Sequence, residues 1–178
     1  MNDNIEHVRR ISAVMKNVCM AIMVVIPVSH ILIWTNFEKA QSLGFYHRTS
    51  YMDGYLLTSN LVTGFFISGF LALVAFMAVR ALRKFFIQTS IGDIFAVKSA
   101  EALSRFAKLL IFYTIVSIPI ETLLSIAMSF NNPVGERLLA VSLQTYDVTL
   151  IFLSFVIFAI SWVMKESVLI AEENAQIV

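Results

Sequence analysis

The chain has 178 residues, of which 58% are hydrophobic and 14% charged, and its mean hydropathy is +0.80. Soluble domains carry about 45–50% apolar and about 25% charged residues, so this composition excludes both a soluble fold of this length and a disordered chain. The single cysteine, Cys19, excludes a disulfide scaffold, and a net charge of +1 provides no bulk basic field for nucleic acid. The composition indicates an integral membrane protein.

A helix that crosses the bilayer needs about 20 mostly apolar residues, and four stretches of the chain meet this requirement. We therefore predict an all-α membrane protein, a bundle of four transmembrane helices in a single domain, 1–178. The predicted spans are residues 17–37, 54–79, 109–130 and 138–164. The predicted remainder is an N-terminal juxtamembrane helix at 1–16, an outer loop at 38–53, a cytoplasmic linker and helix at 80–108, an outer turn at 131–137 and a cytoplasmic tail at 165–178. The apolar part of the first span is longer than that of a signal peptide, so we expect it to be retained.

The distribution of basic residues predicts the orientation of these helices. Ten of the 13 Lys and Arg residues lie in the N-terminal segment, the 80–108 segment and the tail, and three lie on the other side. Both termini should therefore be cytoplasmic. Trp34 and Trp162 stand at opposite membrane boundaries, where aromatic side chains form interfacial belts.

The segment 80–108 is expected to contact the cytoplasm or the membrane surface. Basic residues follow the second span directly, where anionic lipid attracts them. Ser90 to Asp93 should break the helix, after which apolar residues at helical spacing lead into the third span. We favour a surface-lying amphipathic helix here, with a partner-docking helix as the alternative. The residues expected to face a partner are Arg80, Arg83, Lys84, Lys98, Arg105, Glu172 and Glu173.

Polar residues inside the predicted spans are the second candidate site, because charged groups in the bilayer are costly. All of them fall in the outer half of the membrane: His30, Asn60, Thr63, Glu121 and Asp147. Pro27 and Pro119 release backbone carbonyls nearby. Three explanations stay open: hydrogen bonds that fix helix register, a pocket for a ligand or ion that opens outward, or a position at the headgroups.

Motifs for chemistry are missing from the sequence. Three scattered histidines predict neither a zinc site nor a haem site, and no Gly-rich phosphate loop, nucleophile elbow or HExxH stretch occurs. We therefore expect no metal, no cofactor and no enzymatic activity.

Two short stretches resemble a bacterial membrane family called domain of unknown function 2975. Gly92-Asp93-Ile94-Phe95, followed by Ala102-Leu103-Ser104-Arg105-Phe106-Ala107, is similar to its "G-x-I-F … L-R-x-x-G" element. The end of the chain, Leu169 to Asn174 with Ile177-Val178, resembles its terminal "L-x-E-E-N … V". The resemblance implies four spans in the bacterial inner membrane. It also implies a role in controlling a small helix-turn-helix regulator, because such regulators are often encoded beside family members.

These observations predict a non-enzymatic regulatory or scaffold protein that binds a cytoplasmic partner, without direct binding to nucleic acid. The alternative is a small transporter, channel or ligand sensor that uses the outward pocket. A transport role would favour a homo-oligomer, because four short spans do not easily enclose a conduction path.

Overall fold

A computed structural model describes residues 2–43, 57–93, 96–133, 135–141, 143 and 145–176, with side chains from residue 5 to residue 174. Within these residues the chain is helical and has no strand. The helices are α1 (Asn2–Thr35), α2 (Phe37–Ser42), α3 (Thr58–Ile91), α4 (Val97–Ser129) and α5 (Thr145–Gln176). Four of them, all except α2, are long and apolar enough to cross a membrane. The predicted all-helical fold with four candidate spans is confirmed, while most of the predicted outer loop lies outside the described residues.

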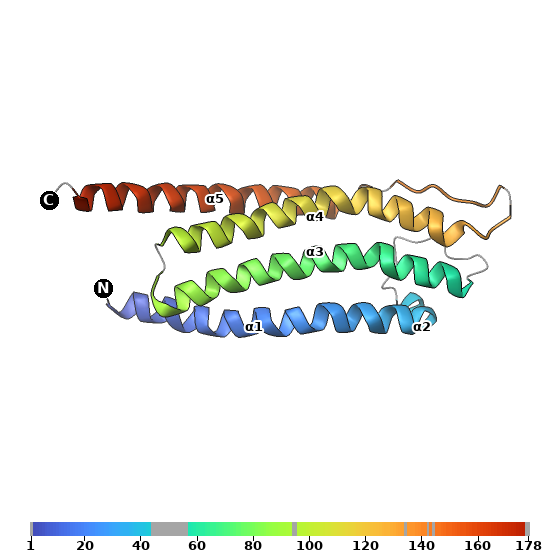
Figure 1. Cartoon of the computed structure of the whole chain (residues 1–178), viewed down its shortest axis with the longest axis horizontal. Helices are drawn as coiled ribbons and strands as arrows, with labels where there is room; N and C mark the ends of the chain where they lie inside the picture. The colour runs from blue at the N-terminus through green and yellow to red at the C-terminus, as the bar shows by residue number, and fades with distance from the viewer. Residues whose placement is uncertain are drawn as a thin grey trace.

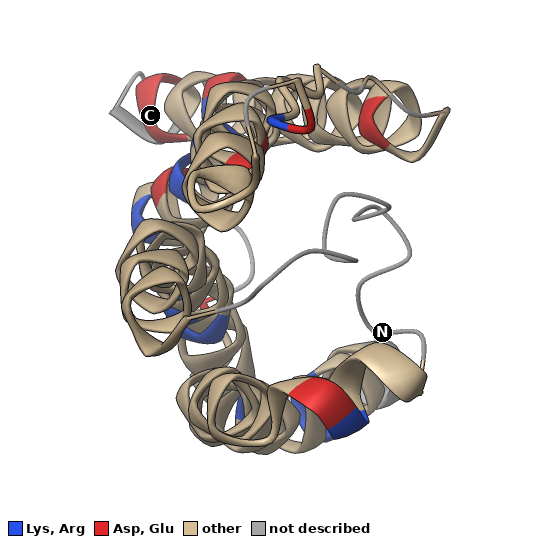
Figure 2. Cartoon of the chain, turned by 90° about the vertical axis from the view of Figure 1, so that its right-hand side faces the viewer, with Lys and Arg blue, Asp and Glu red and all other residues tan. Residues whose placement is uncertain are grey.

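The four long helices run alternately up and down, so both termini and the α3–α4 connection lie at the same end of the molecule (Figure 1). We call this the terminal end and the other the distal end. Helix α3 packs between α1 and α4, and α5 packs on α4. Within the described part of the chain, α1 and α5 do not pack against each other. The bundle is therefore an open, C-shaped row with α1 and α5 as its edges (Figure 2).

Each long helix exceeds the length that a membrane requires. They contain 34, 34, 33 and 32 residues. At about 1.5 Å per residue each is about 50 Å long, against a hydrocarbon thickness of about 30 Å. Segments 1–16 and 80–108 were expected as separate pieces, but the structure places their described residues in the ends of α1, α3 and α4. Residues 97–108 continue directly into α4 as its first turns, so the helix predicted there leads into the third span. Its position on the membrane surface stays a prediction.

The predicted break between α3 and α4 is confirmed. Gly92 ends α3 with a φ of 105°, a left-handed conformation that glycine adopts without a Cβ penalty. Its amide donates to the Thr89 carbonyl at 3.3 Å, and the Asp93 amide donates to the Gln88 carbonyl at 3.2 Å. The Ser99 hydroxyl then donates to the Asp93 carbonyl at 2.6 Å, which ties the connection to the start of α4.

A buried hydrophobic cluster lies at the distal end, where residues of α1, α2 and α4 pack together against partly buried side chains of α3. It contains Trp34, Phe37, Leu124 and Met128. The rings of Trp34 and Phe37 stack with centroids 5.4 Å apart. Trp34 was expected in an interfacial belt, but only 6% of it is exposed, because Gly64 leaves room for its ring. Trp162, by contrast, is 66% exposed and available to lipid.

Helices α4 and α5 approach each other through small residues. On α5 the buried positions recur every seven residues, the spacing of a packed helical seam. They are Asp147, Ser154, Ser161 and Val168. On α4 the buried residues include Ala100, Ala107 and Thr114, also seven apart. Small side chains allow close approach, which stabilises helix pairs in a membrane through van der Waals contact.

Candidate functional site

The charged residues of the long helices gather at the terminal end. In α3 they begin at Arg80, and in α4 they end at Lys108 apart from Glu121. In α5 they begin at Lys165 apart from Asp147. The described apolar part of each helix between this level and the distal end has about 20 residues, which matches a bilayer. The terminal end therefore extends beyond the apolar region, and its charged side chains are suited to contact with water or lipid headgroups.

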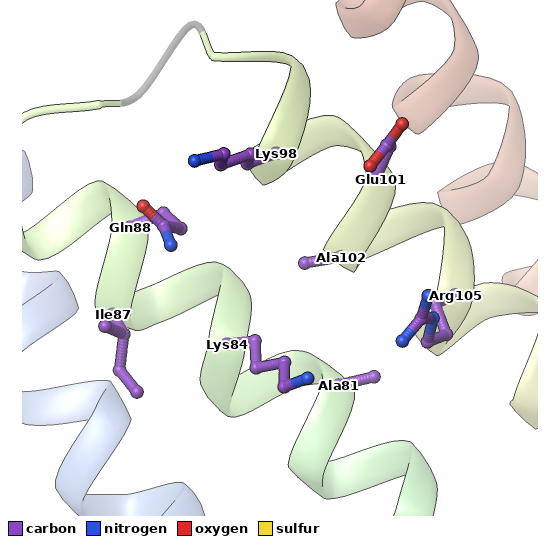
Figure 3. A pocket seen from close by; sticks show the side chains of 8 residues that line it. All are labelled: Ala81, Lys84, Ile87, Gln88, Lys98, Glu101, Ala102 and Arg105. Atoms are coloured by element: carbon purple, nitrogen blue, oxygen red, sulfur yellow. The ribbon is translucent and has the colours of Figure 1, made fainter.

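A groove between α3 and α4 brings together three of the predicted partner-facing residues. It has a volume of about 330 Å³, and we call it the basic groove. Its lining, labelled in Figure 3, is Ala81, Lys84, Ile87, Gln88, Lys98, Glu101, Ala102 and Arg105. Lys84, Lys98 and Arg105 are exposed, and none of them forms a salt bridge within the described part of the chain. The groove thus presents three cations and one carboxylate, Glu101, with no salt bridge between them in the described part of the chain.

The other two arginines of the predicted set lie elsewhere. Arg80 is exposed on α3 but does not line the basic groove. Arg83 is half-buried and faces α1, where its Nη2 atom lies 3.9 Å from the sulfur of Met20. Its Nε atom is buried without a described hydrogen-bond partner. Arg83 therefore contacts α1 and does not line the basic groove.

A second groove runs between α4 and α5 and has a volume of about 700 Å³. Its charged lining is mixed: Arg105, Lys108, Lys165, Glu101 and Glu166. Lys108 lies over the ring of Phe158, with Nζ 5.6 Å from the ring centroid. Sequence reasoning did not select Glu101, Lys108 or Lys165 as site residues. No sequence signal could have grouped them, because they lie on two helices, and a sequence does not show which helices are neighbours.

The end of α5 carries the two acidic residues of the predicted set. Val168 is the last buried residue among the side chains of α5 that the structure describes, and Leu169 to Asn174 are all exposed. Glu172 and Glu173 lie on this uncovered stretch, which extends beyond the first turn of α4 (Figure 1). Leu169 is 38% and Ile170 55% exposed, so the free end of α5 offers acidic and apolar side chains together.

The intramembrane polar residues of α1 and α3 contact backbone groups. The Nε2 atom of His30 lies 3.2 Å from the Phe65 carbonyl on α3. Asn60, only 3% exposed, donates to the carbonyls of Ala127 and Met128 on α4 at 3.1 and 3.0 Å. The Thr63 hydroxyl donates to the Ser59 carbonyl of its own helix. The contacts of His30 and Asn60 therefore join neighbouring helices, whereas that of Thr63 does not.

Two further polar residues of the predicted pocket lie on the adjacent helices α4 and α5. Glu121 is half-buried within α4, two residues after Pro119. Asp147 stands in the first turn of α5 and is 3% exposed. A carboxylate in the first turn interacts favourably with the helix dipole, which accounts for an acid at this position. The ligand or ion pocket stays a hypothesis.

Two serines of α4 hold the segment that precedes α5, and sequence reasoning missed them. The amides of Leu138 and Ala140 donate to the hydroxyls of Ser129 and Ser125, each at 3.1 Å. Ser129 and Ser125 also contact the Leu138 carbonyl at 3.3 and 3.4 Å. Serines four residues apart lie on one helix face, and that spacing was the signal.

No group of three or more His, Cys, Asp or Glu in the described part of the chain is arranged to hold a metal ion. Comparison with known proteins found no match to a family model, a curated protein or a solved structure. The resemblance to domain of unknown function 2975 therefore stays a prediction that rests on the residues quoted for it.

Proposed function

We propose that this chain is a non-enzymatic regulatory or scaffold protein of the bacterial inner membrane that binds a cytoplasmic protein through the free end of α5. In this proposal the terminal end faces the cytoplasm, as the excess of Lys and Arg there favours. The observation that carries the proposal is the uncovered stretch Leu169 to Asn174, which follows the last buried residue, Val168.

The chemistry of this stretch indicates what kind of partner would bind. Glu172 and Glu173 provide negative charge, and Leu169 and Ile170 provide apolar area beside them. A partner with basic side chains around an apolar patch would complement both features. Small DNA-binding regulators have basic surfaces, so the class of partner implied by the family resemblance fits this chemistry.

The length of α5 supports the same proposal. From Lys165 to Gln176 the helix extends by about 17 Å beyond its apolar part. A helix end that only anchors a span needs no such extension, whereas a docking helix must stand clear of the headgroups. The basic residues of α3 and α4 at the terminal end would bind lipid headgroups and so fix the depth of the protein in the membrane, while the end of α5 remains accessible.

The test places a photocrosslinking amino acid at Ala171 in the full-length membrane-embedded protein. We expect one basic partner to be captured, and we expect capture to fall by about tenfold in a Glu172→Lys, Glu173→Lys variant because attraction becomes repulsion. A crosslinker at Leu139, exposed at the distal end, is the matched control and should not capture that partner. Capture that is unaffected by the charge reversal, or no capture from Ala171, would overturn the proposal.

A further inference from the structure

We infer that the basic groove between α3 and α4 binds the phosphate of an anionic phospholipid headgroup. This inference is independent of the proposed partner, because it involves none of the residues at the free end of α5.

The depth of the basic groove is the first observation. Helix α3 has no charged residue from Thr58 to Val79, about 22 residues or 33 Å, which spans the hydrocarbon once. Lys84 lies about one turn beyond the end of this stretch. Arg105 lies about one turn before Leu109, where the apolar part of α4 begins. Both cations are thus at the level of lipid phosphates, which favours a membrane lipid over a soluble ligand.

The charge of the groove is the second observation. It presents three cations and one carboxylate, Glu101, and none of the three cations is engaged by a described carboxylate. Like-charged groups around one cavity repel one another, and an anion placed between them removes that repulsion. Arg105 can donate two parallel hydrogen bonds to phosphate oxygens, whereas the lysines act as point charges.

The arrangement of side chains is the third observation. Lys98 of α4 and Gln88 of α3 lie near each other on one side of the groove, and Lys84 lies on the side toward Arg105 (Figure 3). Ala81 and Ala102 complete the lining with small side chains. This combination leaves a space of about 330 Å³ bordered by donors from two helices, within the range of ligand sites.

The neighbouring groove between α4 and α5 serves as an internal comparison. It has three cations, but two carboxylates, Glu101 and Glu166, offset them. One of its cations, Lys108, is already engaged with the Phe158 ring. The basic groove is therefore the better anion site, although the α4–α5 groove is larger.

The inference is tested by native mass spectrometry of the purified full chain in detergent micelles, titrated with phosphatidylglycerol or phosphatidylcholine. We expect phosphatidylglycerol to be retained at least about tenfold better than phosphatidylcholine. The variant Lys84→Gln, Lys98→Gln, Arg105→Gln should lose about tenfold or more of that preference. Each cation near an anionic lipid contributes about 1 kcal/mol, and about 1.4 kcal/mol corresponds to a tenfold change in affinity. The control Arg80→Gln, Lys108→Gln, Lys165→Gln removes the same charge from positions outside the basic groove and next to the apolar boundary, and it should change that preference by less than about threefold.

Four outcomes would overturn the inference. Equal losses in both triple variants would mean that lipids respond to overall charge, and equal retention of phosphatidylcholine would mean that the phosphate charge is not recognised. Displacement of the lipid by millimolar glycerol phosphate would identify a soluble phosphate ligand instead. The variant Glu101→Gln tests the site without removing a cation, and it should raise phosphatidylglycerol retention by about two- to threefold because it removes a repelling charge. Unchanged or weaker retention in this variant would also contradict the inference.

Discussion

Gly64 of α3 lies directly beneath the indole ring of Trp34 of α1. A Cβ atom at Gly64 would come within 2.7 Å of Cζ3 of Trp34 and 3.2 Å of the Met128 sulfur. The close packing of three helices at the distal end therefore depends on the absence of one methyl group. Helix–helix association in a membrane relies on such contact, because lipid is as apolar as the side chains themselves.

The variant Gly64→Ala should destabilise the protein by about 1–3 kcal/mol, because the Trp34 ring must move out of a packed core. The measurement is a thermal unfolding curve in detergent. Gly69→Ala is the matched control in the same helix, since its Cβ would lie 3.5 Å from His30 Nε2, an ordinary contact. If Gly64→Ala is as stable as Gly69→Ala, the described packing of Trp34 is incorrect.

Replacing Asn60 with leucine should weaken the contact between α3 and α4 by about 1–2 kcal/mol, because the side-chain amide donates to the carbonyls of Ala127 and Met128. Unfolding of the purified protein by a denaturing detergent measures this loss. Thr63→Val is the control one turn away, because the Thr63 hydroxyl bonds only within its own helix in the described structure. Equal effects of the two substitutions would contradict the interhelical role of Asn60.

Replacing both Ser125 and Ser129 with alanine should release the segment that precedes α5. Each hydroxyl accepts an amide hydrogen bond, from Ala140 and Leu138 respectively, and each such bond contributes about 1 kcal/mol. Hydrogen exchange at these two amides should accelerate by about fivefold or more. Ser117→Ala removes a hydroxyl that bonds within α4 and should leave the exchange unchanged. Protection of Leu138 and Ala140 in the double variant would contradict the described contacts.

The orientation predicts which exposed positions share a side of the membrane. In a Cys19→Ala background, cysteines introduced at Glu6, Glu101 and Glu172 should react from the same side with an impermeant thiol reagent. Glu136→Cys should react from the opposite side, because Glu136 lies in the distal connection between α4 and α5. Labelling of residues 101 and 172 from opposite sides would overturn the orientation, and both proposals about the terminal end would be lost with it.

Substitutions that remove the two carboxylate charges within the membrane distinguish the ligand-pocket hypothesis from the partner-binding proposal. Glu121→Gln and Asp147→Asn keep the shapes of the side chains but remove their charges. We expect neither to change capture of a partner from residue 171, because both lie far from the free end of α5. Ion flux into proteoliposomes that contain the native protein or either variant should equal the flux into protein-free vesicles. A flux in the native protein that either variant abolishes would favour the transporter hypothesis instead.

Much of the fold was predictable because one physical requirement dominates it. A backbone in lipid must satisfy its own hydrogen bonds, so long apolar stretches form helices regardless of their neighbours. The break at Gly92 was also predictable, because a left-handed residue there ends a helix locally. Helical spacing also predicted that the segment with Lys98 and Arg105 leads into the third span. Its angle to that span was not predictable, since the same residues suit both a surface helix and the first turns of a longer one.

The candidate sites, too, were predictable from the sequence only in part. Residue types predicted that Lys84, Lys98 and Arg105 belong to a basic surface, but the sequence did not separate them from Arg83, which faces α1. Trp34 was misplaced because its position near a boundary says nothing about which side of the helix faces protein. In a helix that is apolar all round, hydropathy does not mark the packed face.

The sequence alone determined that this protein has four apolar helices with charge concentrated at one end, because the exclusion of charge from hydrocarbon is strong and local. Only the tertiary structure decided the order of packing, in which α1 and α5 are the edges of an open row and the basic groove forms between α3 and α4. That order depends on the shapes of small residues such as Gly64 and Ala107, whose contacts join positions distant in the sequence.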